Sequence, residues 1–311
     1  MNALNEQAHW FGPSENLFGI VTLPPEGTPV RGPGVVMMNP GTLHRVGGAR
    51  LNVRIARQLA ASGFPSIRFD LSGLGDSEPR HDVRPYLESM SADVGHAVDH
   101  LVSQTGLVHF AIVGLCAGAA VSYTAALSDA RFVALVQLEG FAYATRLYKP
   151  FQIGRRLLDG KKWQKVLRGE KSLRPMIARI LSKLTTGKNQ ADRAPIRKIQ
   201  SLEEARGAER DLVNLIPPQS KMRDGLGLLV ARNVRMLNVF AGKDHPYYSY
   251  KGQFVDAFPG LDFKGLLAVE RIAGADHLFS APEHQTWLID RIHATIEGTA
   301  RAINGRNAPS D

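Results

Sequence analysis

Short apolar runs alternate with helical patterns along most of the chain, and this alternation limits the folds available to it. The apolar runs are rich in β-branched or aromatic residues and lie at 34–38, 65–70, 109–114, 132–138, 234–240 and 265–270. Helical spacing of apolar residues occurs between them, at 51–60, 87–103, 119–127 and 283–302. Such alternation is typical of a mostly parallel sheet with helices on both faces. The sequence therefore predicts an α/β fold.

The alternation stops between residues 143 and 225, where the pattern is helical and basic. From 143 to 206 the chain holds 17 Lys or Arg and five Asp or Glu, a net charge of +12. The whole chain carries +9, so the remaining residues together carry −3. We expect a core domain made of residues 1–142 and 226–303, a helical insert at 143–225, and a flexible tail at 304–311.

The concentrated positive charge favours an anionic partner, although a solvated helical face explains it equally well. Nucleic acid is not expected as a partner, because no helix-turn-helix or other nucleic-acid motif accompanies the basic insert. A membrane surface that attracts a basic interfacial helix is a less favoured alternative.

The size and the cysteine content of the chain exclude several other classes of protein. A chain of 311 residues buries a sizeable core without disulfides or metals, and its single Cys excludes an internal disulfide and any multi-cysteine metal site. No apolar stretch approaches the roughly 18 residues that a membrane span needs. The first residues lack a basic segment followed by an apolar one, so we expect a cytoplasmic protein without a secretory signal. We also expect no metal and no cofactor.

The most informative short segment is Gly114-Leu115-Cys116-Ala117-Gly118, between an apolar run and a helical pattern. A nucleophile on a sharp strand-to-helix turn needs small residues two positions before and after it, because the flanking backbones pass close together. Both positions are Gly here, and a helix N-terminus at Cys116 would favour its thiolate. A buried Cys in a glycine-rich turn is the alternative. We predict that Cys116 is a nucleophile.

A second glycine-rich segment, Asp70 to Ser77 (DLSGLGDS), follows the predicted strand at 65–70. With the turn at Cys116, it makes the chain resemble the α/β-hydrolase superfamily, in which a D-x-x-G-x-G-x-S segment follows a strand. An unrelated glycine-rich loop or a phosphate cradle is the alternative, but the segment lacks the Gly-Lys-Ser/Thr of a P-loop. The resemblance implies an α/β-hydrolase fold in which the basic insert is a helical lid.

In that superfamily the nucleophile is followed along the chain by an acid and then by a His. The resemblance implies Asp244 as the acid and His277 as the base, each in a loop after a predicted strand. His277 would accept the thiol proton, and Asp244 would orient the imidazole ring. Two alternatives remain: Glu139, directly after the run at 132–138, could be the acid, and His245 lies beside Asp244 as a less favoured base.

An oxyanion hole for the tetrahedral intermediate needs two backbone N–H groups. One should come from Ala117, directly after the nucleophile, and the other from the loop that follows Met38. Pro40 has no N–H group. We therefore choose Thr42 first and Gly41 second for the other donor.

A narrower resemblance covers residues 17–295. The segments at 44–48, 61–77, 114–119 and 156–170 are similar to bacterial α/β hydrolases associated with exosortase systems. This resemblance implies an enzyme with a Cys nucleophile and leaves its natural substrate open.

Together these segments predict an acyl hydrolase of the thioesterase or esterase type, with a Cys-His-Asp triad and a thioester acyl-enzyme. An acyltransferase to an amine, alcohol or thiol is the first alternative, and a catalytically silent scaffold that binds a ligand or partner is the second. We expect a small-molecule acyl ester or thioester as substrate. The phosphates of a CoA-bound or carrier-bound acyl group would suit four basic residues of the insert, Arg155, Arg156, Lys161 and Lys162.

Overall fold

The central feature of the molecule is a mixed β-sheet. The computed structural model describes residues 5–80, 84–148, 150–151, 154, 216–242 and 248–307. Within these ranges, eight strands lie in the order β1-β2-β4-β3-β5-β6-β7-β8. The strands are β1 (Asn5–Phe11), β2 (Leu17–Leu23), β3 (Gly34–Met38), β4 (Ser66–Phe69), β5 (Phe110–Leu115), β6 (Phe132–Leu138), β7 (Arg235–Ala241) and β8 (Leu267–Ile272).

The six strands from β4 across to β8 run parallel to one another. Parallel strands are covered on both faces, so their sequences are continuously apolar rather than alternating. Every residue of β3 and of β5 is buried, as that arrangement requires. Because parallel strands end at the same edge of a sheet, the loops that follow β3, β5, β6, β7 and β8 all begin at that edge.

Strands β1 and β2 form an antiparallel hairpin that was not predicted from the sequence, and β2 pairs antiparallel with β4. Gly19 interrupts the apolar run of β2, where an added Cβ would lie 2.9 Å from the Cβ of Phe69. Ion pairs attach the edge strand β1 to the core. The carboxylate of Glu6 accepts hydrogen bonds from Arg57 at 2.7 Å and from Arg68 at 2.9 Å, and both guanidinium groups lower the pKa of Glu6.

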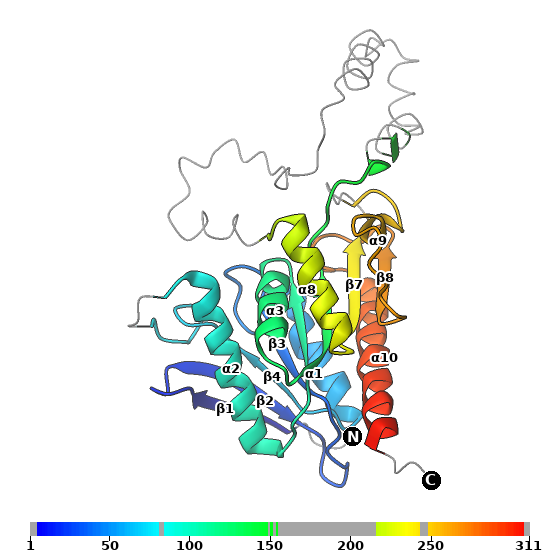
Figure 1. Cartoon of the computed structure of the whole chain (residues 1–311). Helices are drawn as coiled ribbons and strands as arrows, with labels where there is room; N and C mark the ends of the chain where they lie inside the picture. The colour runs from blue at the N-terminus through cyan, green and yellow to red at the C-terminus, as the bar shows by residue number, and fades with distance from the viewer. Residues whose placement is uncertain are drawn as a thin grey trace, which may run out of the picture. The chain divides into compact units, whose positions relative to one another are not determined.

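Helices cover both faces of the sheet, with α1 and α10 on one face and α2, α3 and α8 on the other (Figure 1). Their bounds are α1 (Leu51–Ala61, preceded by a 3-10 turn at Gly48–Arg50), α2 (Tyr86–Thr105), α3 (Ala117–Ser128), α8 (Gln219–Ala231), α9 (Gln253–Asp256) and α10 (Pro282–Asn307). A cluster of buried apolar residues lies beneath α1 and α10, where Leu59 and Ile292 pack with Val136 and Val239 of the strands. Burying each such side chain contributes roughly 1.5–3 kcal/mol to folding.

The chain divides into two compact units. The first holds Met1–Phe141, Gln200–His245 and Gly260–Asp311, and the second holds Ala142–Ile199 and Pro246–Pro259. The described part of the second unit is held by aromatic rings and one buried amide. Tyr143 packs edge-on against Phe258 at 5.5 Å between ring centroids, and the Gln253 side chain donates to the Tyr143 carbonyl at 2.8 Å.

Three boundaries differ from those expected. Helix α8 begins at Gln219 and belongs to the first unit, where Met222 is buried and its carbonyl accepts a hydrogen bond from Tyr123 at 3.2 Å. Residues 246–259 group with the second unit rather than with the core. Helix α10 continues to Asn307, so the predicted flexible tail begins as helix.

Most of the predicted insert, residues 155–215, lies outside the described residues, and the lid therefore stays a prediction.

None of the helices described is both long enough and apolar enough to cross a bilayer.

Candidate active site

Cys116 lies on a sharp turn between β5 and α3. Its backbone has φ 57° and ψ −113°, a conformation that a residue with a side chain rarely adopts and that costs on the order of 1–3 kcal/mol. Two backbone hydrogen bonds hold the turn: the N–H of Cys116 donates to Leu138 O at 2.8 Å, and its carbonyl accepts from Ala119 N at 3.1 Å. The turn therefore holds the partly buried thiol at the edge where the parallel strands end.

The glycines on either side of Cys116 are required by close packing. An added Cβ at Gly114 would lie 2.2 Å from Gly118 O and 2.2 Å from the Ser122 hydroxyl. An added Cβ at Gly118 would lie 2.5 Å from Asn39 O, in the loop after β3. All three distances are too short for a real carbon atom, which explains the spacing of Gly, Cys and Gly in the sequence.

His277 comes from the loop between β8 and α10, and Asp276 orders that loop. The Asp276 carboxylate accepts the backbone N–H groups of Leu278 and Ser280, each at 3.0 Å. The Ser280 hydroxyl also donates to it, and these hydrogen bonds lower the pKa of Asp276. Phe279 is completely buried and anchors the loop in the core. The loop thus presents a half-exposed imidazole next to Cys116.

The acid that contacts His277 is Glu139, directly after β6. Its carboxylate oxygen Oε2 lies 2.9 Å from His277 Nδ1, which leaves Nε2 of the ring for the thiol. The other oxygen, Oε1, accepts the backbone N–H of Ala241 at the end of β7. The Glu139 backbone N–H itself donates to Val239 O at 2.8 Å. Glu139 is therefore attached to β7 through both its backbone and its carboxylate, and it exposes only 2% of its side chain.

Both neighbours of His277 favour its protonated form. The hydrogen bond with Cys116 is the largest cause, and the hydrogen bond with Glu139 is the second; together they raise the pKa of His277 from 6.5 to about 10. Burial of the ring acts in the opposite direction and is outweighed. An imidazolium beside the sulfur stabilises a thiolate, which is the nucleophilic form of cysteine.

Several predicted residues lie outside the described part of the chain. These are Asp244 and His245 in the loop after β7, and the basic residues Arg155, Arg156, Lys161 and Lys162 of the insert. The structure thus brings together Cys116, His277 and the alternative acid Glu139. The sequence signal for Glu139 was its place directly after a buried parallel strand.

The backbone donors proposed for the oxyanion hole lie on two segments that touch. Ala117 begins α3, where the first N–H groups of a helix have no partner within it. Gly41 and Thr42 belong to the loop after β3, in which Gly41 has φ +57° and Leu43 N donates to Pro40 O at 3.1 Å. Within the described ranges, no intramolecular hydrogen bond uses the N–H of Gly41, Thr42 or Ala117.

The order of the strands and the turn at Cys116 are those of an α/β hydrolase. A family model described as Hydrolase_4, serine aminopeptidase, S33, matches residues 35–206, which is more than half of the chain. The chain belongs to this family of α/β hydrolases. Although the family is named for a serine, this hydrolase has Cys116 on the turn between β5 and α3.

Other known proteins resemble the hydrolase over different shares of its length. YcjY, an uncharacterized protein of Escherichia coli (strain K12), is 30% identical over 130 residues, so the chain spans about 40% of that protein. A carboxyl esterase from Bacillus coagulans aligns over 96% of this chain and 100% of its own, with a TM-score of 0.59 and 12% identity. A dienelactone hydrolase from Anabaena variabilis aligns over 95% and 98%, with a TM-score of 0.52 and 14% identity. Identities this low establish the fold alone.

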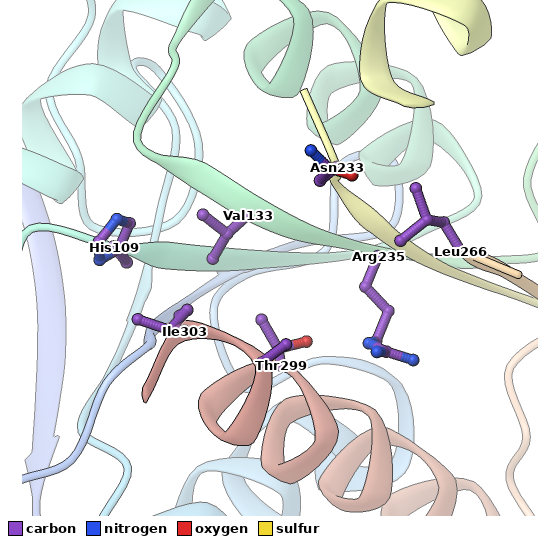
Figure 2. Close-up of a pocket in the computed structure, with 8 residues that line it drawn as sticks. His109, Val133, Asn233, Arg235, Leu266, Thr299 and Ile303 are labelled. Atoms are coloured by element: carbon purple, nitrogen blue, oxygen red, sulfur yellow. The ribbon is translucent and has the colours of Figure 1, made fainter. Parts of the chain in front are cut away.

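A cavity of about 90 Å³ lies at the opposite edge of the hydrolase sheet (Figure 2). Val133 near the start of β6, Arg235 at the start of β7 and Thr299 of α10 face it. Because Cys116 follows the other end of β5, this cavity does not contribute to the candidate active site. Among the described residues, no group of three or more His, Cys, Asp or Glu is arranged to hold a metal ion.

Proposed function

We propose that this hydrolase is an acyl hydrolase of the thioesterase or esterase type, with Cys116 as nucleophile and His277 as base. The observation that carries the proposal is the hydrogen-bonded line from Cys116 through His277 to Glu139. A nucleophile, a base and a group that orients the base are what an activated thiol needs. The strained turn at Cys116 supports the same role, because backbone strain of this kind concentrates at functional sites.

Glu139 is the acid of the proposed triad. Its bond to His277 Nδ1 fixes the tautomer and orientation of the ring, and its negative charge stabilises the imidazolium. Asp244, the acid expected from the sequence, remains testable by substitution.

The proposed reaction has two acyl-transfer steps. The Cys116 thiolate attacks the carbonyl carbon, and the oxyanion is bound by the N–H of Ala117 and by that of Thr42 or Gly41. As the carbon–sulfur bond forms and the bond to the leaving group breaks, His277 gives its proton to the departing alcohol or thiol. Water then attacks the thioester, His277 takes its proton, and the carboxylic acid and the thiolate are released.

The chemistry of a thioester intermediate defines the substrate class. A thioester is more activated than an ester, so it is reached readily from thioesters and activated esters or lactones. The family description names an aminopeptidase, but an unactivated amide is a harder substrate for a thiolate, because its amine is a poor leaving group. We therefore propose small-molecule acyl esters or thioesters as substrates, CoA-bound acyl groups included.

Intact-protein mass spectrometry tests the proposal directly, because the chain has one Cys and the Cys116→Ala variant removes that sulfur while it keeps every other acylation site. The protein is mixed with nitrophenyl esters, acyl-CoA thioesters and an amino-acid nitroanilide, beside a Cys116→Ala variant. We expect an acyl-mass adduct on the wild type with the esters or thioesters, decay of that adduct in water, and no adduct on the variant.

Three other outcomes contradict parts of the proposal. Turnover by Cys116→Ala would show that Cys116 is not the nucleophile. Adduct decay that requires an added amine, alcohol or thiol would make the protein an acyltransferase. Labelling of Cys116 by iodoacetamide without any acylation or turnover would identify a catalytically silent scaffold.

A further inference from the structure

Asp70 is a buried carboxylate at the end of β4 that takes no part in the line from Cys116 to Glu139. Its side chain is completely buried. Oxygen Oδ1 accepts the backbone N–H of Arg45 at 2.6 Å. Oxygen Oδ2 accepts the Arg45 guanidinium at 2.5 Å and the backbone N–H of Asp76 at 3.1 Å. Three donors, one of them charged, offset the large cost of burying this negative charge.

The rest of the D-x-x-G-x-G-x-S segment folds around this carboxylate. An added Cβ at Gly75 would lie 2.2 Å from Asp70 Oδ2, so only glycine allows the segment to close over the carboxylate. The Ser77 hydroxyl donates to Asp70 O at 2.7 Å and accepts the N–H of Phe18 at 2.9 Å. Asp76 forms a second ion pair with Arg45 at 2.7 Å. The segment therefore holds Asp70 in one place.

Asp70 also anchors one end of the loop that carries Gly41 and Thr42. At the other end of that loop, the buried Asn39 side chain donates to Phe69 O at 2.9 Å and accepts from Asn52 Nδ2 at 3.2 Å. Asn39 O in turn lies against Gly118 in the first turn of α3. The loop is thus attached to the end of β4 at Asn39 and again at Arg45, with the candidate oxyanion donors between the two attachments.

We infer that Asp70 is a positioning residue for the oxyanion hole. Held by the glycine-rich segment, it fixes the loop from Asn39 to Arg45 and through it the N–H of Thr42 or Gly41. A displacement of about 1 Å in a catalytic group can slow a reaction by about 100-fold, and the Asp70–Arg45 bonds limit such displacement. The inference rests on the proposed function, because it concerns how the tetrahedral intermediate of that reaction is stabilised.

The test compares two reactions of the same sulfur. Acylation by a nitrophenyl ester passes through an oxyanion, whereas alkylation by iodoacetamide does not and reports only the thiolate. The variant is Asp70→Asn, which keeps the shape of the side chain and removes its charge. The matched control is Asp93→Asn. Asp93 is equally buried, pairs with Arg80 at 2.6 Å and accepts the N–H and the hydroxyl of Ser72 in the glycine-rich segment, yet it makes no hydrogen bond to the loop from Asn39 to Arg45 among the described contacts.

We expect Asp70→Asn to acylate about 10- to 100-fold more slowly than the wild type, since losing one oxyanion donor outright costs about 10²–10³-fold. Its alkylation rate and the pH at which alkylation sets in should stay within about two-fold and a few tenths of a pH unit of the wild type. Asp93→Asn should keep its alkylation rate and should slow acylation much less than Asp70→Asn does, because it loosens the glycine-rich segment only at Ser72.

A second pair of variants covers a failure of Asp70→Asn to fold, as judged by circular dichroism. Arg45→Met removes the guanidinium and leaves Asp70 with two backbone donors. It should slow acylation about three- to ten-fold, and Arg45→Lys should restore part of the rate.

The inference would be overturned if the folded Asp70→Asn variant, or Arg45→Met in its place, were acylated at the wild-type rate. Equal losses in acylation and alkylation would overturn it too, and so would equal losses in Asp70→Asn and Asp93→Asn. Absence of acylation in the wild type, with alkylation intact, would instead disprove the proposed function and remove the basis of the inference.

Discussion

Two buried carboxylates lie on opposite sides of β5, and their partners differ. Glu139, after β6, gives one oxygen to the backbone N–H of Ala241 and the other to the His277 ring. Asp70, after β4, gives its oxygens to two backbone N–H groups and to the Arg45 guanidinium. Glu139 therefore orients a ring that gains and loses a proton, whereas Asp70 holds a loop in place. Removing the charge should change the pH dependence in the first case and the rate at every pH in the second.

The largest effect is expected from Glu139→Gln, which should lower kcat by about 10³-fold, because the ring of His277 loses its orienting acid. The pKa of His277, raised to about 10 in the wild type, should fall in part, because the Glu139 contribution is lost while the larger one from the hydrogen bond with Cys116 remains. Alkylation of Cys116 should then set in at a higher pH than in the wild type, because a weaker imidazolium stabilises the thiolate less.

Asp244→Asn is the comparison that can break this assignment. We expect it to keep most of the activity and the wild-type pH profile of alkylation. If Asp244→Asn lost activity while Glu139→Gln retained it, Asp244 would be the acid and the contrast between Glu139 and Asp70 would fail.

An intermediate effect is expected from Gly118→Ala, which reaches the oxyanion loop from the other side. The new Cβ would meet Asn39 O at 2.5 Å, so the loop or the start of α3 must shift. Acylation should fall about ten-fold while alkylation is preserved, and overpacking should lower the free energy of unfolding by about 1–3 kcal/mol. Stopped-flow acylation and urea denaturation measure the two effects. Similar losses of acylation and alkylation would indicate damage to the turn at Cys116 rather than to the loop.

The smallest effect is expected on stability against pH. Folding raises the pKa of His277 from 6.5 to about 10, so its contribution to stability is complete below pH 6.5 and is lost as the pH rises through about 10. The Tm difference between the wild type and Glu139→Gln should therefore shrink from pH 6 to pH 10.5. Because about half of the imidazole is exposed, solvent screening should keep this change to a few degrees. A Tm difference that grows with pH would contradict the ion pair between Glu139 and His277.

Much of the fold could be predicted from the sequence, since continuous apolar runs mark buried parallel strands. The strand at 132–138 matches β6, and the helix predicted after Cys116 is α3. The hairpin of β1 and β2 escaped prediction because Gly19 interrupts β2 and β1 is a half-exposed edge strand. The first part of helix α8, up to residue 225, was assigned to the insert. The helix is attached to the core by a hydrogen bond from Tyr123 to the backbone carbonyl of Met222, and a backbone contact of this kind leaves no pattern in the sequence.

The sequence by itself determined the turn at Cys116, because a strand-to-helix turn depends on residues that are neighbours in the chain, and glycine at 114 and 118 leaves few alternatives. It also placed His277 in a loop after a strand. Only the tertiary structure decided which carboxylate meets that His and what Asp70 holds. Glu139 and His277 are 138 residues apart and Asp70 and Arg45 are 25 apart. Such contacts depend on how strands are ordered and how loops close, which the local pattern of the sequence does not contain.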